Sequence, residues 1–163
     1  METGREGISL IKKFESLHDG DLTMIGLQPK MCPSGIWTEG WGRAMRDGKG
    51  NFIKGAANKK LAYSRASITT EAQANEALLK DLDVFERIVS SKIKIKLDQN
   101  QFDALVCHTY NTGGSDTLFK LINRKAPEEQ IRKWFETKYI TGGGKVLPGL
   151  IRRRKAEADL YFK

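Results

Sequence analysis

The first regular pattern along the chain predicts an amphipathic helix over residues 5–17. Ile8, Ile11 and Glu15 are spaced by three and four positions, so they share one face of such a helix, while lysines and serines occupy the other face. Glu15 therefore ends an apolar stripe. It is either a carboxylate that reaches solvent at the edge of that stripe or a partly desolvated acid that can act on a substrate.

An irregular region rich in turn-forming residues follows over residues 17–65. Aspartate, glycine, serine and proline gather there in short groups, which favour turns and interrupt helical spacing. The clearest strand between these groups is the segment IWTEGW at residues 36–41. The pattern predicts a small β-lobe over residues 18–66.

The chain after residue 68 is predicted to be helical. The segments 70–73 and 98–101 each begin with Thr or Asp and end with Gln, as a capping box at a helix start requires. Apolar residues at helical spacing follow both segments. Further helices are predicted over residues 116–124, 127–137 and 148–160, with a Thr-Gly-Gly-Gly break at 141–144.

These elements predict an α+β fold in a single domain over residues 1–163. The β-lobe takes residues 18–66, and residues 1–17 with 67–163 form a larger, all-helical lobe. No internal repeat or low-complexity segment divides the chain further.

The net charge of +8 is unevenly placed, because residues 120–163 carry +7 of it. A field of this sign favours a polyanionic partner such as nucleic acid, an anionic membrane or a cell wall. The basic run at residues 152–155 is followed at once by acidic and apolar residues, which is typical of a solvated helix face. We therefore expect no nucleic-acid partner.

The sequence has no apolar run of the ~20 residues that span a bilayer, and its first residues lack the apolar core of a signal peptide. We expect synthesis in the cytoplasm without a signal peptide and no stable membrane insertion. Cys32 and Cys107 should then stay reduced. Together with His18 and His108 they show no paired metal-ligand spacing, so we expect neither a metal nor an organic cofactor.

Glycoside hydrolysis is the chemistry that the remaining features favour. It needs a carboxylic acid that donates to the leaving oxygen and a second group across the sugar, either a nucleophile or a base for water. Glu15 has the position expected of the acid. Trp37 and Trp41 offer flat faces for sugar rings, although a Trp in a small lobe more often packs in a core.

Four segments resemble the phage-type lysozymes or endolysins of glycoside hydrolase family 24. They are LIKKFE at residues 10–15, CPSGIWTEGWG at 32–42, DQNQFDALVCHTYNTG at 98–113 and GKVLPGLIRRR at 144–154. Each segment alone is a modest signal, but four in the right order over nearly the whole chain are specific. The resemblance implies the lysozyme-like fold, with a cleft between the β-lobe and the helical lobe.

The resemblance also implies roles for individual residues. Glu15 matches the general acid, and Thr38 matches the threonine that helps to hold the attacking water. Cys32 stands six positions before Thr38, where the family most often has Asp. Since an unperturbed thiol is mostly neutral at pH 7, Cys32 needs nearby positive charge to act as a base or nucleophile.

Three interpretations of this cysteine stay open. Cys32 supplies the second catalytic group, which is the interpretation we favour. Alternatively, Asp19 or Asp21 folds back from an insertion over Leu17–Lys30 and supplies a carboxylate. In the third interpretation Cys32 is inert and activity is weak or lost. The resemblance implies an inverting reaction with a positioned water, whereas a thiolate nucleophile would give retention.

The further residues expected to bind substrate or to support the site are Trp37, Asn111, Arg153 and Arg154. Asn111 matches an asparagine near the cleft floor of the family, although a plain helix end would also explain it. Arg153 or Arg154 could pair with Glu15 across the cleft.

The function implied by the resemblance is that of a muramidase. It would cleave the β-1,4 bond between N-acetylmuramic acid and N-acetylglucosamine in peptidoglycan, as a monomer, and reach the bacterial wall through a separate membrane lesion. This is the lytic, antibacterial role of a phage endolysin. The alternative is a catalytically impaired wall-binding protein on the same scaffold, which would bind peptidoglycan without releasing reducing ends.

Overall fold

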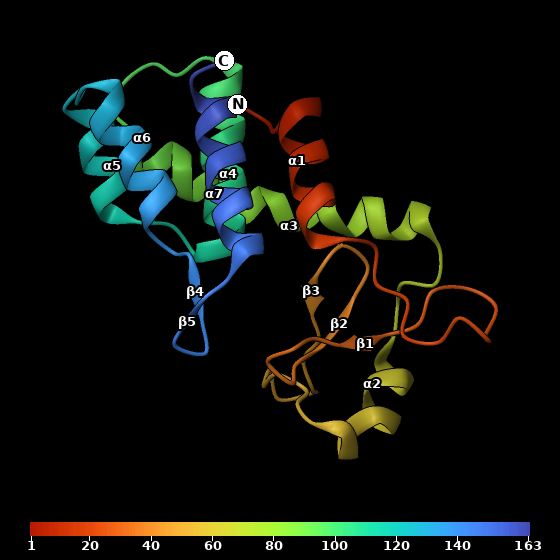
Figure 1. Cartoon of the computed structure of the whole chain (residues 1–163). Helices are drawn as coiled ribbons and strands as arrows, with labels where there is room; N and C mark the ends of the chain where they lie inside the picture. Colours follow the sequence, from red (N-terminus) through yellow and green to blue (C-terminus); the bar gives the residue numbers. More distant parts are fainter. The chain divides into compact units, whose positions relative to one another are not determined.

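The structure is a computed structural model that describes residues 1–163 (Figure 1). The chain divides into two compact units. The larger unit is formed by residues 1–14 and 82–163, and the smaller unit by residues 15–81. The α+β fold predicted from the sequence is confirmed, with helices in both units and two small antiparallel sheets. None of the helices is long and apolar enough to span a bilayer.

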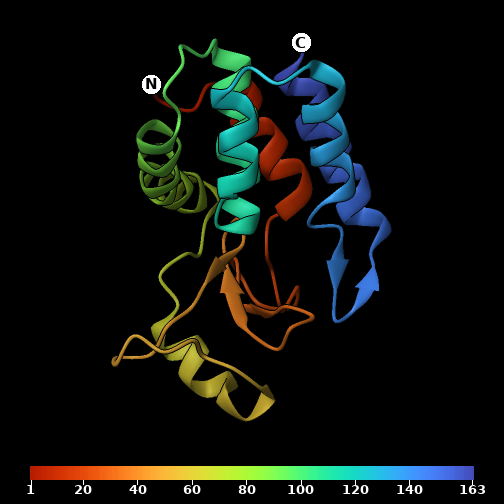
Figure 2. The ribbon, with the colours of Figure 1, turned by 90° about the vertical axis from the view of Figure 1, so that its left-hand side faces the viewer.

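The larger unit is mainly helical. Its elements are α1 (Arg5–Glu15, whose last residue belongs to the smaller unit), the second half of α3 (Glu71–Lys92), α4 (Gln99–Thr112), α5 (Asp116–Asn123), α6 (Glu128–Thr137), the hairpin of β4 (Thr141–Gly142) with β5 (Lys145–Val146), and α7 (Pro148–Tyr161). Residues 102–109 of α4 are all buried, and α4 packs against α7. α7 also packs against α6, as Figure 2 shows. The core of this unit therefore lies around α4.

α1 is anchored to α4 by a single carboxylate. The backbone N–H groups of Gly4 and Gly7 donate hydrogen bonds to Asp103, at 2.8 and 3.0 Å. A β-carbon on Gly7 would lie 2.8 Å from Cβ of Asp103, so only glycine allows this approach. Ile11, from the predicted apolar stripe, is fully buried. These contacts fix the helix whose last residue is Glu15.

The predicted helix starts are confirmed in detail. At α4, Asp98 accepts from the backbone N–H of Gln101, and the Gln101 side chain accepts from the backbone N–H of Asp98. At α3, Thr70 and Gln73 exchange the same two bonds. α4 then ends at Gly113, whose positive φ of 82° closes the helix in the left-handed conformation.

The smaller unit is built around a three-stranded antiparallel sheet. Its elements are β1 (Lys30–Met31), β2 (Trp37–Glu39), β3 (Arg43–Ala44), a short 3₁₀ turn (Ala56–Asn58), α2 (Lys59–Arg65) and the first half of α3. The strand order is β1-β2-β3, with Thr38 opposite both Lys30 and Ala44. Two hydrophobic clusters form the core: one around Trp37, Met45, Ile53 and Ala62, the other around Ile68, Ala74 and Ala77.

The smaller unit extends further along the chain than the predicted β-lobe of residues 18–66. The second of its hydrophobic clusters explains the difference, because Ala74 and Ala77 come from the first turns of α3. Arg43 also binds Asp81 through two hydrogen bonds of 2.8 and 2.9 Å, at the end of this unit. The first half of α3 is therefore part of the smaller unit's packing.

Three local features differ from the predicted elements. α1 ends at Glu15 rather than at residue 17, because Ser16 has a positive φ of 62° that a helix does not allow. α2 lies in the segment expected to be irregular and short-stranded. The Gly-rich break at 141–144 forms strand β4 and the two-residue turn of the β4–β5 hairpin.

Candidate active site

One pocket of the smaller unit brings together two of the predicted catalytic residues. It has a volume of about 400 Å³ and is lined by two short segments, residues 15–18 and 30–33. The first segment begins with Glu15 at the end of α1, and the second contains Cys32 after β1. No group of three His, Cys, Asp or Glu side chains in the structure could hold a metal ion. The pocket thus offers a carboxyl group and a thiol for acid–base chemistry, with the imidazole of His18 in the same lining.

The carboxylate of Glu15 lies against the turn between β2 and β3. Gly42, in this turn, has a positive φ of 88°. A β-carbon on Gly42 would lie 2.7 Å from Oε2 of Glu15 and 3.3 Å from its Cδ. The backbone thus packs directly on the half-buried carboxyl, and any other residue at position 42 would displace it.

Cys32 is a free, partly exposed cysteine at the start of a tight turn. The backbone N–H of Gly35 donates to the carbonyl oxygen of Cys32 at 2.8 Å, and Ser34 Oγ lies 2.9 Å from Cys32 Sγ. Burial acts to raise the pKa of the Cys32 thiol. Hydrogen bonds from the Ser34 side chain and from backbone groups of the turn, chiefly that of Ile36, outweigh it and lower the pKa. A negative charge on the sulfur is therefore stabilised locally.

Thr38 is not among the residues that line the pocket. It is buried, and its hydroxyl donates a 2.8 Å hydrogen bond to the carbonyl oxygen of Lys30, which lines the pocket. This bond uses the single proton of the hydroxyl but leaves its oxygen able to accept. Thr38 can therefore fix β1 beside β2 and still accept a hydrogen bond from a water molecule.

Neither alternative carboxylate lines the pocket. Asp19 accepts hydrogen bonds from the backbone N–H groups of Asp21 and Gln28, and so holds the two ends of the loop together. Asp21 accepts from the backbone and hydroxyl of Thr23, and the hydroxyl bond is the main reason for its lowered pKa. Both aspartates are engaged in shaping the loop between residues 17 and 30, which favours Cys32 as the second group.

The structure favours packing roles for the two tryptophans. Trp37 is buried in a core cluster, and its indole N–H donates to the carbonyl oxygen of Gly55 at 2.8 Å. Trp41 packs against the second cluster and donates to Asn75 at 2.8 Å. Trp37 therefore supports β2 from within rather than offering an open ring face to a sugar.

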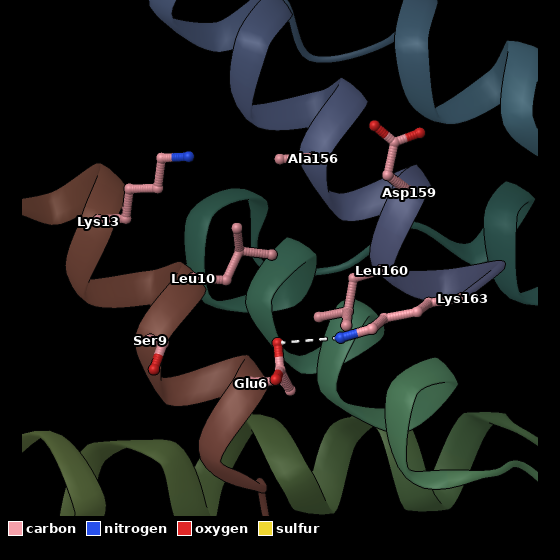
Figure 3. A pocket seen from close by; sticks show the side chains of 8 residues that line it. All are labelled: Glu6, Ser9, Leu10, Lys13, Ala156, Asp159, Leu160 and Lys163. Carbon is pink, nitrogen blue, oxygen red and sulfur yellow. Dashed lines mark ion pairs between the residues drawn. The ribbon is translucent and has the colours of Figure 1, made fainter.

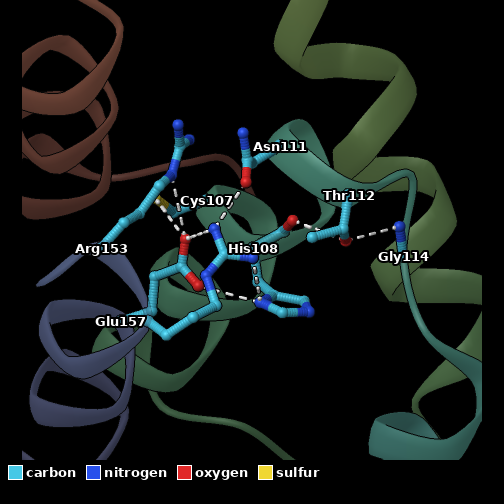
Figure 4. A network of polar contacts seen from close by, with 8 residues as sticks. Cys107, His108, Asn111, Thr112, Gly114, Arg153 and Glu157 are labelled. Atoms are coloured by element: carbon cyan, nitrogen blue, oxygen red, sulfur yellow. Dashed lines mark hydrogen bonds and ion pairs between the residues drawn. The ribbon is translucent and has the colours of Figure 1, made fainter. Parts of the chain in front are cut away.

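The remaining predicted residues meet in a buried polar cluster of the larger unit (Figure 4). Arg153 and Arg154 both bind Oε1 of Glu157, at 3.2 and 3.0 Å, and all three side chains are buried. Arg154 also donates to the side-chain oxygen of Asn111 at 2.7 Å, which holds this exposed residue at the end of α4. The two arginines therefore support the fold around Asn111 and α7.

Cys107 and His108 complete this cluster. Nδ1 of His108 lies 2.9 Å from Oε2 of Glu157, and its Nε2 is buried without a partner. Desolvation lowers the pKa of His108 and raises that of Cys107. Both residues are part of the buried packing of the larger unit.

A second pocket, of about 320 Å³, lies between α1 and α7 in the larger unit (Figure 3). Its acids are already engaged. Glu6 pairs with Lys163 at 3.6 Å, and Asp159 pairs with Arg132 and Lys155, each at 2.7 Å. Its other lining residues are Ser9, Leu10, Lys13, Ala156 and Leu160. The pocket around Glu15 and Cys32 is therefore the better candidate for acid–base chemistry.

Sequence reasoning missed three residues of the candidate site. His18 lines the pocket, but from the sequence it was considered only as a zinc ligand. The available signal was its position three residues after Glu15, just beyond the end of α1. Ser34 was seen only as a turn residue, although its hydroxyl bonds the sulfur. Gly42 belongs to a recognised segment, but its contact with Glu15 requires the folded turn.

Comparison with known proteins supports the predicted family. The phage lysozyme family model matches residues 23–157, a segment that includes Cys32 and Thr38 and begins after Glu15. The endolysin of Acyrthosiphon pisum secondary endosymbiont phage 1 is 29% identical, and the match covers 99% of this chain and 98% of that protein. The endolysin of Lactococcus phage c2 is 30% identical over the whole chain, which spans 61% of that relative's length.

A solved structure agrees with this result. The endolysin from Escherichia coli O157:H7 phage FAHEc1 superposes with a TM-score of 0.73 at 29% identity, and the match covers 100% of this chain and 94% of that one. The lysozyme-like fold inferred from the four sequence segments is confirmed. The chain belongs to the phage lysozyme family.

Proposed function

We propose that this protein hydrolyses the β-1,4 bond between N-acetylmuramic acid and N-acetylglucosamine in peptidoglycan, with Glu15 as general acid. Its membership of the phage lysozyme family and its endolysin relatives support the lysozyme-type glycosidase. The observation that supports the residue assignment is that Glu15 and Cys32 both line one pocket. A carboxyl and a second polar group around one sugar are what glycoside hydrolysis needs.

In the proposed reaction, Glu15 donates its proton to the glycosidic oxygen as the bond from that oxygen to the anomeric carbon breaks. A water molecule attacks the anomeric carbon and gives its proton to the thiolate of Cys32. The hydroxyl of Thr38 accepts a hydrogen bond from the same water. With water as the nucleophile, the configuration at the anomeric carbon is inverted.

The charge distribution suits the proposed substrate. Residues 120–163 carry +7 of the net +8 charge, so the end of the chain attracts an anionic wall. We propose that the protein acts as a monomer on peptidoglycan, after synthesis in a bacterial cytoplasm and release through a membrane lesion made by another protein. The alternative, a wall-binding protein without activity, is less favoured because the relatives are endolysins.

Release of reducing ends from purified peptidoglycan tests the proposal. The wild type should release muramic-acid reducing ends, identified by product mass, and Glu15→Gln should abolish that release while peptidoglycan binding persists. Glu6→Gln is the matched control, since Glu6 lies in the same helix but outside this pocket. Binding without release by the wild type would leave the wall-binding alternative standing.

A further inference from the structure

His18 is held in the pocket by two backbone carbonyl groups. Its Nδ1 lies 3.1 Å from the carbonyl oxygen of Gly40 and 3.2 Å from that of Ser16. The backbone N–H of His18 donates to the same Gly40 oxygen at 2.9 Å. These bonds fix the imidazole, and His18 lines the same pocket as Glu15 and Cys32.

This arrangement determines which ring nitrogen exchanges a proton. A carbonyl oxygen only accepts hydrogen bonds, so Nδ1 carries a hydrogen in both the neutral and the protonated imidazole. Proton exchange then takes place at Nε2, which is a base in the neutral ring. His18 thus lines the pocket with one ring nitrogen, Nε2, that can accept a proton.

The other groups around the pocket do not fit this task. Glu15, from α1, must hold a proton for the leaving oxygen, and the ammonium group of Lys30, from β1, only donates hydrogen bonds. Asp19 follows His18 but is engaged with the backbone of its own loop. From the end of β2, Gly40 contributes only its carbonyl group to the contacts of His18. His18 is the remaining lining side chain that has a nitrogen able to accept a proton.

We propose that His18 takes the proton of the Cys32 thiol and, as an imidazolium, stabilises the resulting thiolate. The S–H bond of Cys32 breaks, its electron pair stays on the sulfur, and a new N–H bond forms at Nε2 of His18. A water molecule in the pocket of about 400 Å³ relays the proton between the two groups. This inference rests on the proposed function, in which the thiolate is the base for the attacking water.

The rate of Cys32 alkylation by iodoacetamide, measured from pH 5 to pH 10, tests the pair directly because only the thiolate reacts. The other cysteine, Cys107, should not react with iodoacetamide, since it is fully buried and its pKa is raised. His18→Asn is the informative variant. Its side-chain amide can still donate to Gly40 in place of Nδ1, but it has no counterpart of Nε2.

We expect His18→Asn to slow alkylation at pH 7 about tenfold and to move the midpoint of the profile to higher pH. Lys30→Gln removes another cation that lines the pocket and should change the rate less than about twofold, as is usual for an exposed charge. His18→Gln serves as a second variant if His18→Asn does not fold. Equal rates for the wild type and the histidine variants would overturn the proposal.

This assay uses no peptidoglycan, so its outcome is independent of the proposed function. A histidine-dependent alkylation rate in a protein that releases no reducing ends would retain the pair and reject the muramidase. Normal release of reducing ends, together with an alkylation rate that does not depend on His18, would reject the His18–Cys32 pair and retain the muramidase.

Discussion

The backbone of Gly42 and the carboxyl of Glu15 are in such close contact that a β-carbon on Gly42 would lie 2.7 Å from Oε2 of Glu15. The turn between β2 and β3 therefore sets the position of the proposed general acid. Because catalysis depends on the placement of a donor to within fractions of an ångström, this glycine contributes to the reaction without any reactive group of its own.

Gly42→Ala should reduce the rate of reducing-end release about 100-fold, because a displaced acid loses its alignment with the leaving oxygen. It should also destabilise the fold by about 1–2 kcal/mol, since alanine is strained at positive φ. Gly50→Ala is the matched control: Gly50 has a φ of 85°, and no atom lies near its added β-carbon. Both variants should lose similar stability in urea denaturation. Equal activity in the two would contradict the assigned contact.

The pH dependence of the reaction should follow the thiol of Cys32. Its pKa is lowered because hydrogen bonds from Ser34 and the turn outweigh burial, so the thiolate forms at lower pH than in a free cysteine. The rate should rise with pH through this pKa. Ser34→Ala removes a hydrogen bond to sulfur and should move the rise to higher pH, whereas Cys32→Asp should move it far toward acid pH. Superimposable pH–rate profiles for the wild type and Cys32→Asp would exclude the thiolate as base.

Glu157→Gln should destabilise the larger unit by about 3–5 kcal/mol, because it leaves buried Arg153 and Arg154 without the carboxylate that both bind. Asp159→Asn, two residues later in α7, removes two solvent-exposed ion pairs and should cost only about 1 kcal/mol. Chemical denaturation at pH 7 measures both. Equal effects would show that the buried cluster does not depend on its anion.

The buried His108 should make the fold less stable in mild acid. Desolvation lowers its pKa in the folded state, although Glu157 acts in the opposite direction. The unfolded state therefore takes up this proton first, and stability is lost as the pH falls below the unfolded pKa of ~6.5. The wild type should lose more stability between pH 7.5 and pH 5.5 than His108→Asn, in which the amide can still donate to Glu157. If both proteins lose the same stability between pH 7.5 and pH 5.5, groups other than His108 cause the acid sensitivity.

Much of the fold follows from local sequence patterns. The capping boxes at residues 70–73 and 98–101 and the apolar stripe ending at Glu15 depend on spacing along one helix, and the structure has each of them. α2 and the β4–β5 hairpin were not predicted. Their sequences contain few buried residues, so apolar spacing carries little information there.

The candidate site was predicted less completely, for the same physical reason. Glu15 and Cys32 could be proposed because they stand in recognisable segments, and the structure brings both to one pocket. The burial of Trp37 and the engagement of Asp19 depend on contacts between segments distant in sequence. The place of His18 follows from its bonds to Gly40, 22 positions away. Such contacts exist only in the folded chain.

The most direct test of the central claim compares initial rates of reducing-end release for Cys32→Ser, Cys32→Asp and Glu15→Gln with that of the wild type. Below pH 7, Cys32→Asp should be at least as active as the wild type, since a carboxylate is already ionised there. Loss of a general acid or base costs about 10²–10⁴-fold in rate, so Cys32→Ser and Glu15→Gln should fall by that amount. Wild-type rates in Cys32→Ser, or in Glu15→Gln, would contradict the account.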